Sequence, residues 1–320
     1  MRLAGEETTR GSSPFSSPVY SPALHRLCLL TVAATFLLIV AGALVVGNGA
    51  GLAVPDWPLS FGTWMPPMVG GVFYEHGHRM IATTVGFLTI VLALWLWRAE
   101  PRAWVRRLAW ITLAAVIVQG VLGGITVLYK LPTPIVVGHA CLAQIFFCLT
   151  LSLAVFTGKS WNQPMPLLED RSSPSFRQLT ATTSLALVVQ LTFGAALRHQ
   201  ALDVIPHLLG AILAGILVGW VVFRAMTQLP EHRPLQQLAL TMGLLLIVQL
   251  ALGGVSYFTR LGANSNSALD AAMIWTTTAH VTVGALVLGT SWVLTLFSFR
   301  RMSAARVATS FDPSPHKSPA

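Results

Sequence analysis

Charged residues are scarce in this chain of 320 residues. Only 10% of them are Asp, Glu, Lys or Arg, while 54% are hydrophobic, and a soluble domain is typically about 25% charged. A soluble protein of this composition would expose large apolar patches to water. The composition therefore indicates an integral membrane protein that has the lipid bilayer as its solvent.

Acidic residues are the scarcer of the two charged kinds, since 11 Asp and Glu stand against 20 Lys and Arg, giving a net charge of +9. Such a basic balance is also found in nucleic-acid-binding proteins. Here, however, the Lys and Arg residues stand in the short gaps between apolar runs, which suits membrane topology rather than a nucleic-acid-binding patch. We therefore expect no nucleic-acid partner.

Cysteine is rare as well. The three cysteines, Cys28, Cys141 and Cys148, all lie inside apolar runs, and none forms a CxxC motif. Cys141 and Cys148 are two turns apart on one helical face, which is too far for a disulfide within that helix. We expect all three to be small core side chains.

Long apolar runs, by contrast, are abundant. Runs of about 20 residues are long enough to span a bilayer as helices, and their continuity excludes the alternating pattern of a β-barrel. The first run is too long for the core of a signal peptide, so we expect it to remain as an anchor. The predicted fold is an all-α integral membrane protein with eight transmembrane helices. The expected spans are 27–47, 78–97, 108–129, 135–156, 179–197, 206–226, 237–258 and 271–298.

The Lys and Arg residues are distributed unevenly between the two sides of these spans. Sixteen of them lie in the two tails or in the gaps on the same side as the tails, and only Arg79, Lys130, Arg198 and Arg260 lie on the other side. Cytoplasmic segments of membrane proteins carry the excess of Lys and Arg. The sequence therefore predicts that both ends of the chain, the tails 1–26 and 299–320, are cytoplasmic.

An internal repeat divides the chain. "VIVQGVLGG" at 116–124 resembles "LIVQLALGG" at 246–254, and 187–195 carries a weaker copy, "LVVQLTFGA". Glycine pairs in membrane helices allow neighbouring helices to approach closely. We therefore predict two four-helix units in parallel orientation, 27–156 and 179–298, joined by a cytoplasmic linker at 157–178.

Four histidines lie in the even-numbered spans, in the half nearer the outer side. They are His78 and His139 in the first unit and His207 and His280 in the second. Ionisable side chains within membrane spans are costly and usually functional. Zinc would require four ligands, whereas each unit offers two imidazoles without a nearby cysteine. Two axial imidazoles suit a porphyrin iron better, so we predict bis-histidine haem binding in each bundle.

Several segments around these histidines are specific motifs: "GLAVPDWPLSFG" at 51–62, "PPMVGG" at 66–71, "FYEHGHRMIA" at 73–82, "GHACLAQ" at 138–144 and "TAHVTVGAL" at 278–286. With these motifs the chain resembles the haem A synthases over essentially all of residues 27–298. The first loop and the Glu-x-x-His segment are specific to that family, whereas the transmembrane pattern alone would not be.

The resemblance implies a function and a division of labour. Haem A synthases oxidise the C8 methyl group of haem O to a formyl group, through a hydroxymethyl intermediate, to make haem A for cytochrome oxidase. Their fold is a pair of pseudo-symmetric four-helix bundles. By this resemblance, His207 and His280 would hold a resident haem b, and His78 and His139 would face the substrate, haem O. Glu75 matches the catalytically critical glutamate of the family.

The neighbours of Glu75 are further candidates for the site. If the second helix already includes Glu75, then Glu75 and His78 share one helical face, and His76 does not. We expect contacts either with haem propionates or with the outer loop from four residues: His76, Arg79, Asp56 and Trp57. For Arg79 the alternative is a simple anchor at the membrane interface, and for Glu75 it is a carboxylate favoured by the helix dipole.

The sequence departs from the family in its first outer loop, which lacks the cysteine pair that some members carry. No thiol relay can be assigned here. The corresponding outer gap of the second unit, 198–205, is short and has no PDWP motif. The second unit is therefore a poor candidate for handling the substrate.

The main alternative is a di-haem b-type membrane cytochrome that transfers electrons, because bis-histidine pairs would serve both functions. Glu75 and the long outer loop occur in one unit only, which favours the enzyme. We expect a bacterial inner membrane location, with the mitochondrial inner membrane as the alternative. Expected partners are membrane lipid, haem O synthase, cytochrome oxidase assembly factors and further copies of the chain.

Overall fold

The computed structural model describes residues 20–164, 167–170, 172–230, 232–262 and 267–304. It contains eight helices that are long and apolar enough to cross a membrane, which confirms the predicted all-α membrane fold. They are α1 (Pro22–Gly47), α2 (Gly71–Ala99), α3 (Ala103–Leu128), α4 (Thr133–Thr157), α6 (Phe176–Arg198), α7 (Val204–Gln228), α8 (Arg233–Gly262) and α9 (Ser267–Arg301).

The observed helices extend beyond the expected spans because polar residues cap and lengthen them. Helix α1 begins at Pro22, before the expected Leu27, where the Ser21 hydroxyl accepts a hydrogen bond from the Leu24 N–H. Helix α6 begins with a reciprocal capping box between Ser175 and Gln178. Such caps satisfy backbone N–H groups that the first helical turn leaves without partners.

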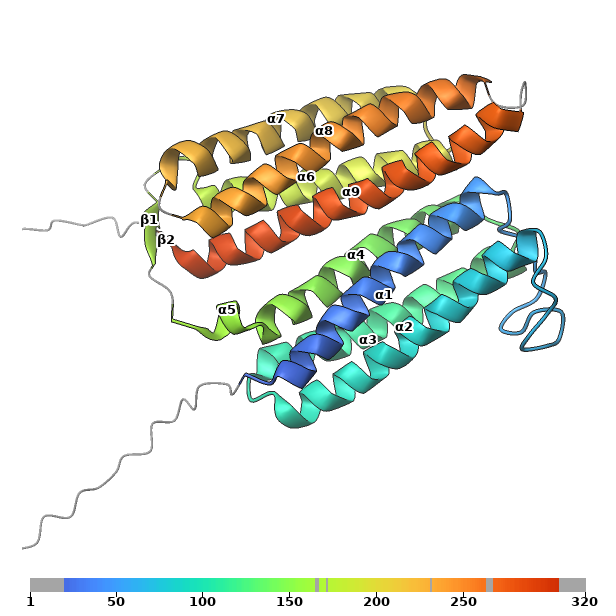
Figure 1. Cartoon of the computed structure of the whole chain (residues 1–320), viewed down its shortest axis with the longest axis horizontal. Helices are drawn as coiled ribbons and strands as arrows, with labels where there is room; N and C mark the ends of the chain where they lie inside the picture. Colours follow the sequence, from blue (N-terminus) through green and yellow to red (C-terminus); the bar gives the residue numbers. More distant parts are fainter. Residues whose placement is uncertain (1–19, 165–166, 171, 231, 263–266, 305–320) are drawn as a thin grey trace, which may run out of the picture.

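The eight helices form two bundles, which Figure 1 shows as two separate groups. In the first bundle α1 packs against α2 and α4, and α3 packs against the same two helices. In the second bundle α6 packs against α7 and α9, and α8 does the same. Each unit is thus a closed ring of four helices in chain order, although any closer pseudo-symmetry between the two units stays a prediction.

Helices α1, α4, α6 and α9 form the seam between the bundles. The Trp292 indole N–H on α9 donates to the Ser152 hydroxyl on α4 over 2.7 Å. Gly289 lets α9 approach closely, because a Cβ there would lie 2.9 Å from Leu151 and 3.0 Å from Phe147. The bundles are therefore joined by direct packing and not only by their linker.

The linker between the bundles contains structure of its own, which the sequence did not indicate. It includes the short helix α5 (Lys159–Asn162) and the strand β1 (Leu168–Asp170). This strand pairs in parallel with β2 (Met302–Ala304), directly after α9. The first residues of the expected tail 299–320 therefore belong to α9 and β2, while 305–320 lie outside the described residues, as do 1–19 of the other tail.

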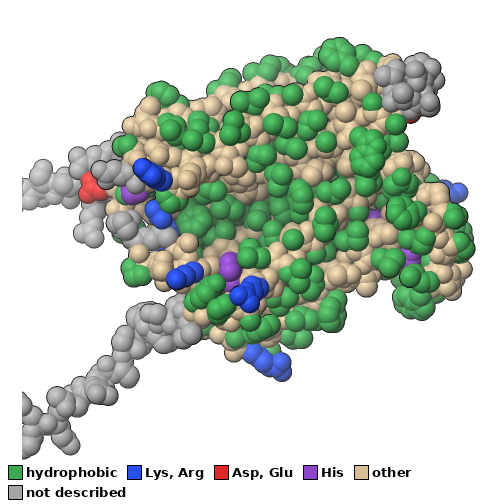
Figure 2. Space-filling view, in the orientation of Figure 1, with side chains coloured by type: hydrophobic (Ala, Val, Ile, Leu, Met, Phe, Trp, Pro, Cys, Tyr) green, Lys and Arg blue, Asp and Glu red, His purple; other side chains and the backbone are tan. Residues whose placement is uncertain are grey.

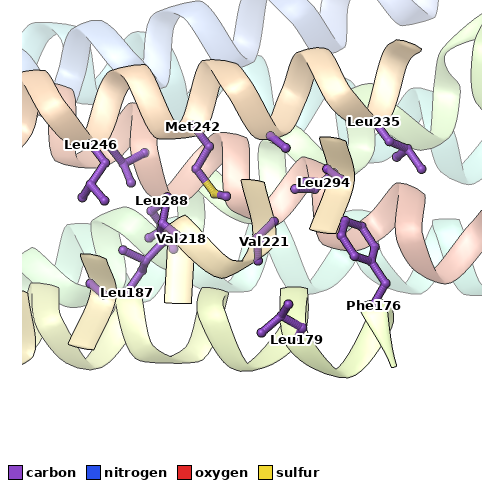
Figure 3. Close-up of a cluster of buried hydrophobic side chains, with 14 of the residues drawn as sticks. Phe176, Leu179, Leu187, Val218, Val221, Leu235, Met242, Leu246, Leu288 and Leu294 are labelled. Carbon is purple, nitrogen blue, oxygen red and sulfur yellow. The ribbon is translucent and has the colours of Figure 1, made fainter. Parts of the chain in front are cut away.

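The buried apolar core of the second bundle lies in the half nearer the linker. Figure 3 shows this cluster, which includes Phe176, Leu187, Val218, Met242 and Leu288. On each of the four helices, its members stop short of the level of the polar residues Gln190, His207, Gln249 and His280. A second cluster, around Cys28, Leu92 and Leu153, occupies the same half of the first bundle. These four polar residues therefore lie in the half of the second bundle farther from the linker.

Figure 2 shows apolar side chains spread along the flank of the helices, as a lipid-facing surface requires. Most Lys and Arg side chains visible on this face lie toward the end from which both termini leave. Cys28 and Cys148 are buried, as expected of small core side chains, whereas Cys141 is only partly buried.

Candidate active site

The four predicted histidines lie on four different helices, and each is only partly buried. His78 is on α2, His139 on α4, His207 on α7 and His280 on α9. Within the described residues no group of three or more His, Cys, Asp or Glu could hold a metal ion. Any iron bound by these histidines would therefore need further ligands, which the four nitrogens of a porphyrin supply.

The pair in the second bundle has the spacing that one shared iron requires. The ring centroids of His207 and His280 are 6.2 Å apart, and the ring planes are inclined by 78°. A metal–imidazole bond is about 2 Å long and a ring nitrogen is about 1.1 Å from the ring centre, so two axial imidazoles place their centroids about 6 Å apart. The donor pair thus fits a haem iron. In the first bundle, His78 and His139 lie on α2 and α4.

Each of the four imidazoles packs against a glycine on the preceding long helix, a feature that we call the glycine seat. A Cβ added at any of these glycines would lie within 3.0–3.4 Å of the Cε1 atom of the histidine. Any larger side chain would push the ring away from its position. The seats are Gly42 for His78, Gly123 for His139, Gly194 for His207 and Gly253 for His280.

Glutamines of the sequence repeat contact three of the four histidines. The Gln119 side-chain amide donates to the His139 carbonyl over 3.0 Å, and the Gln190 amide donates to the His207 carbonyl over 2.9 Å. Sequence analysis found these glutamines as part of the repeat but assigned them no role. The signal that could have found them is their position, one helical turn before the glycine seat.

Helix α2 begins at Gly71 and not at the expected His78, so the first outer loop spans 48–70 and is shorter than the predicted gap. Glu75 is therefore helical, as the argument about a shared helical face requires. Because residues three apart lie on one face of a helix, Glu75 and His78 point to the same side of α2.

Glu75 is buried, with 4% of its surface exposed. One carboxylate oxygen accepts a hydrogen bond from the Val54 N–H over 2.8 Å, and the other forms an ion pair with Arg79 over 2.6 Å. A buried carboxylate requires such partners to remain charged. It still has free lone pairs, since an ionised carboxylate offers about four acceptor positions.

Arg79 connects α2 to the outer loop. Its guanidinium donates to the carbonyl oxygens of Asp56 and Leu59, each over 2.8 Å. The structure therefore shows Arg79 in contact with the outer loop, which is one of the two kinds of contact that the sequence predicted for it. The Glu75–Arg79 pair and its loop partners fix residues 54–60 against the outer end of the helix that carries His78.

His76 is buried and points to the loop. Its Nδ1 atom lies 2.8 Å from the Ser60 hydroxyl, and its Nε2 atom is buried without a hydrogen-bond partner. This geometry agrees with the prediction that His76 does not share the helical face of His78.

Asp56 and Trp57 shape the tip and the base of the loop. The backbone N–H groups of Gly62 and Phe61 donate to the Asp56 carboxylate and lower the pKa of Asp56 below its usual value. Trp57 inserts against Gly124 on α3, where a Cβ would come within 2.7 Å of the indole. Asp56 thus closes a turn, and Trp57 docks the loop onto the bundle; both contacts are within the protein.

The outer gap of the second bundle is much smaller and carries no comparable set of contacts among the described residues. It runs from His199 to Asp203, and the Arg198 guanidinium donates to the Val46 carbonyl at the end of α1. Burial, and then the nearby positive charge of Arg198, lower the pKa of His199. His199 therefore favours its neutral form.

Comparison with known proteins agrees with the geometry. Residues 69–205 match the family model COX15-CtaA, described as cytochrome oxidase assembly protein. The matched region includes Glu75, His78, Arg79 and His139, and it ends before His207. It thus covers α2, α3 and α4 of the first bundle, the linker and α6, but not α1.

Several curated relatives carry the name haem A synthase. The protein of Symbiobacterium thermophilum is 26% identical over 291 residues, which cover 88% of this chain and 85% of the relative. That of Shouchella clausii is 30% identical over 183 residues, 55% of this chain and 59% of the relative. That of Roseobacter denitrificans is 33% identical over 135 residues, 39% of this chain and 35% of the relative. The chain thus spans most of the first relative but only about a third to three fifths of the other two. By these matches the chain is similar to proteins named haem A synthase and, over residues 69–205, to a family described as cytochrome oxidase assembly protein.

Proposed function

We propose that this membrane protein is an oxidoreductase that converts haem O to haem A. The observation that carries the proposal is the asymmetry between two bundles that both present a histidine pair. Among the residues that the structure describes, only the first bundle places a buried carboxylate, Glu75, one helical turn from an imidazole and beneath an outer loop. An electron-transfer cytochrome with two equivalent haems would not need this difference.

The proposed reaction oxidises one methyl carbon in two steps of two electrons each. Water supplies the oxygen: the methyl group and water give a hydroxymethyl group, two protons and two electrons. The hydroxymethyl group then loses two more protons and two electrons to become the formyl group. The electrons leave to an acceptor outside the chain.

In this proposal the first bundle, 27–156, binds the substrate haem O between His78 and His139. Glu75 takes up a proton from the attacking water, or stabilises positive charge that develops on the methyl carbon. Arg79 holds the Glu75 carboxylate in place through their ion pair. Asp56, Trp57 and His76 order the loop, which excludes bulk water from this end of the bundle.

The second bundle, 179–298, would hold a resident haem b through His207 and His280. The centroid distance of 6.2 Å suits two axial ligands of one iron. When bound, such a haem accepts and passes on single electrons. The protein's own part is to keep both imidazoles in place, through the glycine seats and the Gln190 amide.

We further propose that the protein lies in the bacterial inner membrane with both ends in the cytoplasm, on the distribution of Lys and Arg. The linker 157–178 would then be cytoplasmic and the loop 48–70 would face the outer side. Haem O synthase and the assembly factors of cytochrome oxidase are the proposed partners, because the first supplies the substrate and the second receive the product.

The test is co-expression with a haem O synthase, followed by haem extraction and chromatography. The proposal requires haem A or its hydroxymethyl precursor to appear when the chain is co-expressed and to be missing when it is left out. If haem O accumulates unchanged in the cells and the purified chain contains only haem b, the di-haem electron-transfer cytochrome becomes the better description.

A further inference from the structure

The outer loop of the first bundle, residues 48–70, exposes large apolar side chains along its second half. Figure 2 shows apolar side chains at this end of the first bundle, at the lower right. Single exposed apolar side chains are ordinary, but a group of them in one loop marks a surface that contacts something other than water. Four side chains, which we call the loop tip, each expose between 55% and 79% of their surface: Phe61, Trp64, Met65 and Val69.

The loop carries almost no charge that would favour water. Residues 48–70 contain no Lys, Arg or Glu, and their one acidic residue is Asp56. The Asp56 carboxylate accepts hydrogen bonds from the backbone N–H groups of Phe61 and Gly62, so it serves a turn within the loop. The outer gap of the second bundle, 199–203, differs, since a histidine, a glutamine and an aspartate occur within its five residues.

The loop lies beside the outer ends of the helices and does not stand far above them. Figure 1 shows it folded back beside the start of α2, and the Ser60 hydroxyl lies 2.8 Å from His76, which is five residues inside that helix. Trp57 packs against Gly124, four residues before the end of α3 and so about 6 Å inside it. Ser60 and Thr63 exchange backbone hydrogen bonds, which keeps the loop tip close to this level.

This level corresponds to the headgroup layer of a bilayer. The 29 residues of α2 make a helix about 43 Å long. The hydrocarbon core of a bilayer is about 30 Å thick, and the thickness including both interfacial layers is about 40–45 Å. The first turns of α2, and the loop beside them, therefore fall within the interfacial layer, where tryptophan is enriched because its ring is apolar and its N–H is polar.

The loop tip also continues the lipid-facing surface of α2. Exposed apolar side chains recur on this helix every seven residues, which is close to two turns, and so form one stripe. The stripe begins only four residues after Val69, and no charged residue stands between them. Its members are Phe73, Met80, Phe87 and Leu94.

We propose that the loop tip inserts into the bilayer leaflet on its own side and is covered by lipid, at the boundary between headgroups and acyl chains. Three observations carry this inference: the exposed apolar side chains, the near absence of charge, and the continuity with a stripe on a membrane-spanning helix. The inference does not depend on the proposed function. It gives the loop a lipid contact at its tip, while its base is fixed to Glu75 and Arg79.

The test measures which solvent surrounds position 64. A nitroxide is attached to Trp64→Cys in a background where Cys28, Cys141 and Cys148 are replaced by Ala, and the protein is placed in lipid nanodiscs. Power-saturation electron paramagnetic resonance then compares collisions with oxygen, which partitions into lipid, and with a water-soluble nickel chelate. The matched controls carry the label on exposed positions at mid-span in α2 and in the outer gap of the second bundle, Phe87→Cys and Ala201→Cys.

We expect the ratio of oxygen to nickel collisions at position 64 to be several-fold higher than at position 201 and to approach the ratio at position 87. A ratio equal to that at position 201 would place the loop tip in water and overturn the inference. Low collision rates with both reagents would also overturn it, because they would show that protein, either a partner or a second copy of the chain, covers the tip.

A second measurement keeps the inference testable if the cysteine-free background does not fold. Tryptophan fluorescence of the chain with its native cysteines is quenched either by lipid brominated near the headgroup or by iodide in the water. The difference between this chain and Trp64→Phe isolates the signal of Trp64, and circular dichroism shows that the variant is folded. We expect that signal to be quenched by brominated lipid and protected from iodide; the opposite pattern would contradict lipid insertion.

Discussion

The Glu75 carboxylate can contribute in two ways: it can anchor the outer loop, and it can take part in the reaction. It fixes the loop through the Val54 N–H and Arg79, and it lies on the helical face of His78. A buried carboxylate used only to fix a loop could be replaced by another acceptor. One that takes up a proton, or faces a developing cation, could not.

We predict that Glu75→Gln retains the resident haem and binds haem O but loses oxidation by a factor of about 100 or more, which is the usual contribution of a general base. The measurement is haem A formed per protein, with expression levels matched. Ser60→Ala is the control, since it removes the loop contact with His76 but leaves the carboxylate of Glu75 and its bonds to Val54 and Arg79 in place. If this control is impaired as severely as Glu75→Gln, or if Glu75→Gln retains near-normal activity, the carboxylate is not the catalytic group.

The four histidines should respond to substitution in two distinct ways. We predict that His207→Ala or His280→Ala abolishes the low-spin b-type spectrum, because a bis-histidine haem requires both axial imidazoles. His78→Ala or His139→Ala should leave most of that spectrum and impair conversion of haem O. The check is the absorbance spectrum of each purified variant. Equal loss of resident haem in all four would contradict the division between the bundles.

At the scale of single residues, sequence reasoning found what depends on residue type and spacing. Four histidines at matching places in a repeat can be recognised in the chain itself, and so can the i, i+3 relation of Glu75 and His78. The partners of Glu75 could not be found in that way. Val54 contributes only its backbone N–H, from a loop whose path depends on Arg79 and Trp57, and any residue type except proline supplies that group.

At the scale of helices, apolar runs predicted the existence and order of all eight spans but placed most of their ends too far inside. Polar residues at the ends of a span interrupt an apolar run without ending the helix. Helix α2 is the clearest case, since the polar segment Glu75–Arg79 is part of the helix and is stabilised by an ion pair four residues apart. The small sheet of β1 and β2 was missed because each strand has only three residues.

The glycine seats predict a sharp difference between two adjacent glycines of α8. A Cβ at Gly253 would lie 3.0 Å from the His280 Cε1 atom, whereas nothing lies within 4 Å of a Cβ at Gly254. We expect Gly253→Ala to displace the imidazole and lower resident haem occupancy by roughly tenfold, and Gly254→Ala to leave it unchanged. Haem content per purified protein measures both. Similar occupancy in the two variants would show that the ring tolerates displacement.

At the scale of the whole molecule, the repeat predicted two four-helix units, and the structure contains two rings of four helices in chain order. The seam between them was not predictable, because it depends on which face of each helix turns to the other bundle. Contacts such as that of Trp292 with Ser152 join residues 140 positions apart. The same seam packs the two bundles together, and among the described residues the long loop 48–70 lies at the end of the first bundle.

The arrangement of the whole chain across the membrane gives the last prediction. The helices alternate in direction, so Pro132 and Gln200 lie at the end of the molecule that carries the loop 48–70, and Asn162 lies at the end that carries the termini. Because 16 of the 20 Lys and Arg residues belong to the terminal side, we expect that side to be cytoplasmic. Reporter fusions after Pro132 and Gln200 should be active on the outer side, and a fusion after Asn162 on the cytoplasmic side. A reversed pattern would place the loop and Glu75 in the cytoplasm. Haem O would then have to approach the first bundle from the opposite face of the membrane.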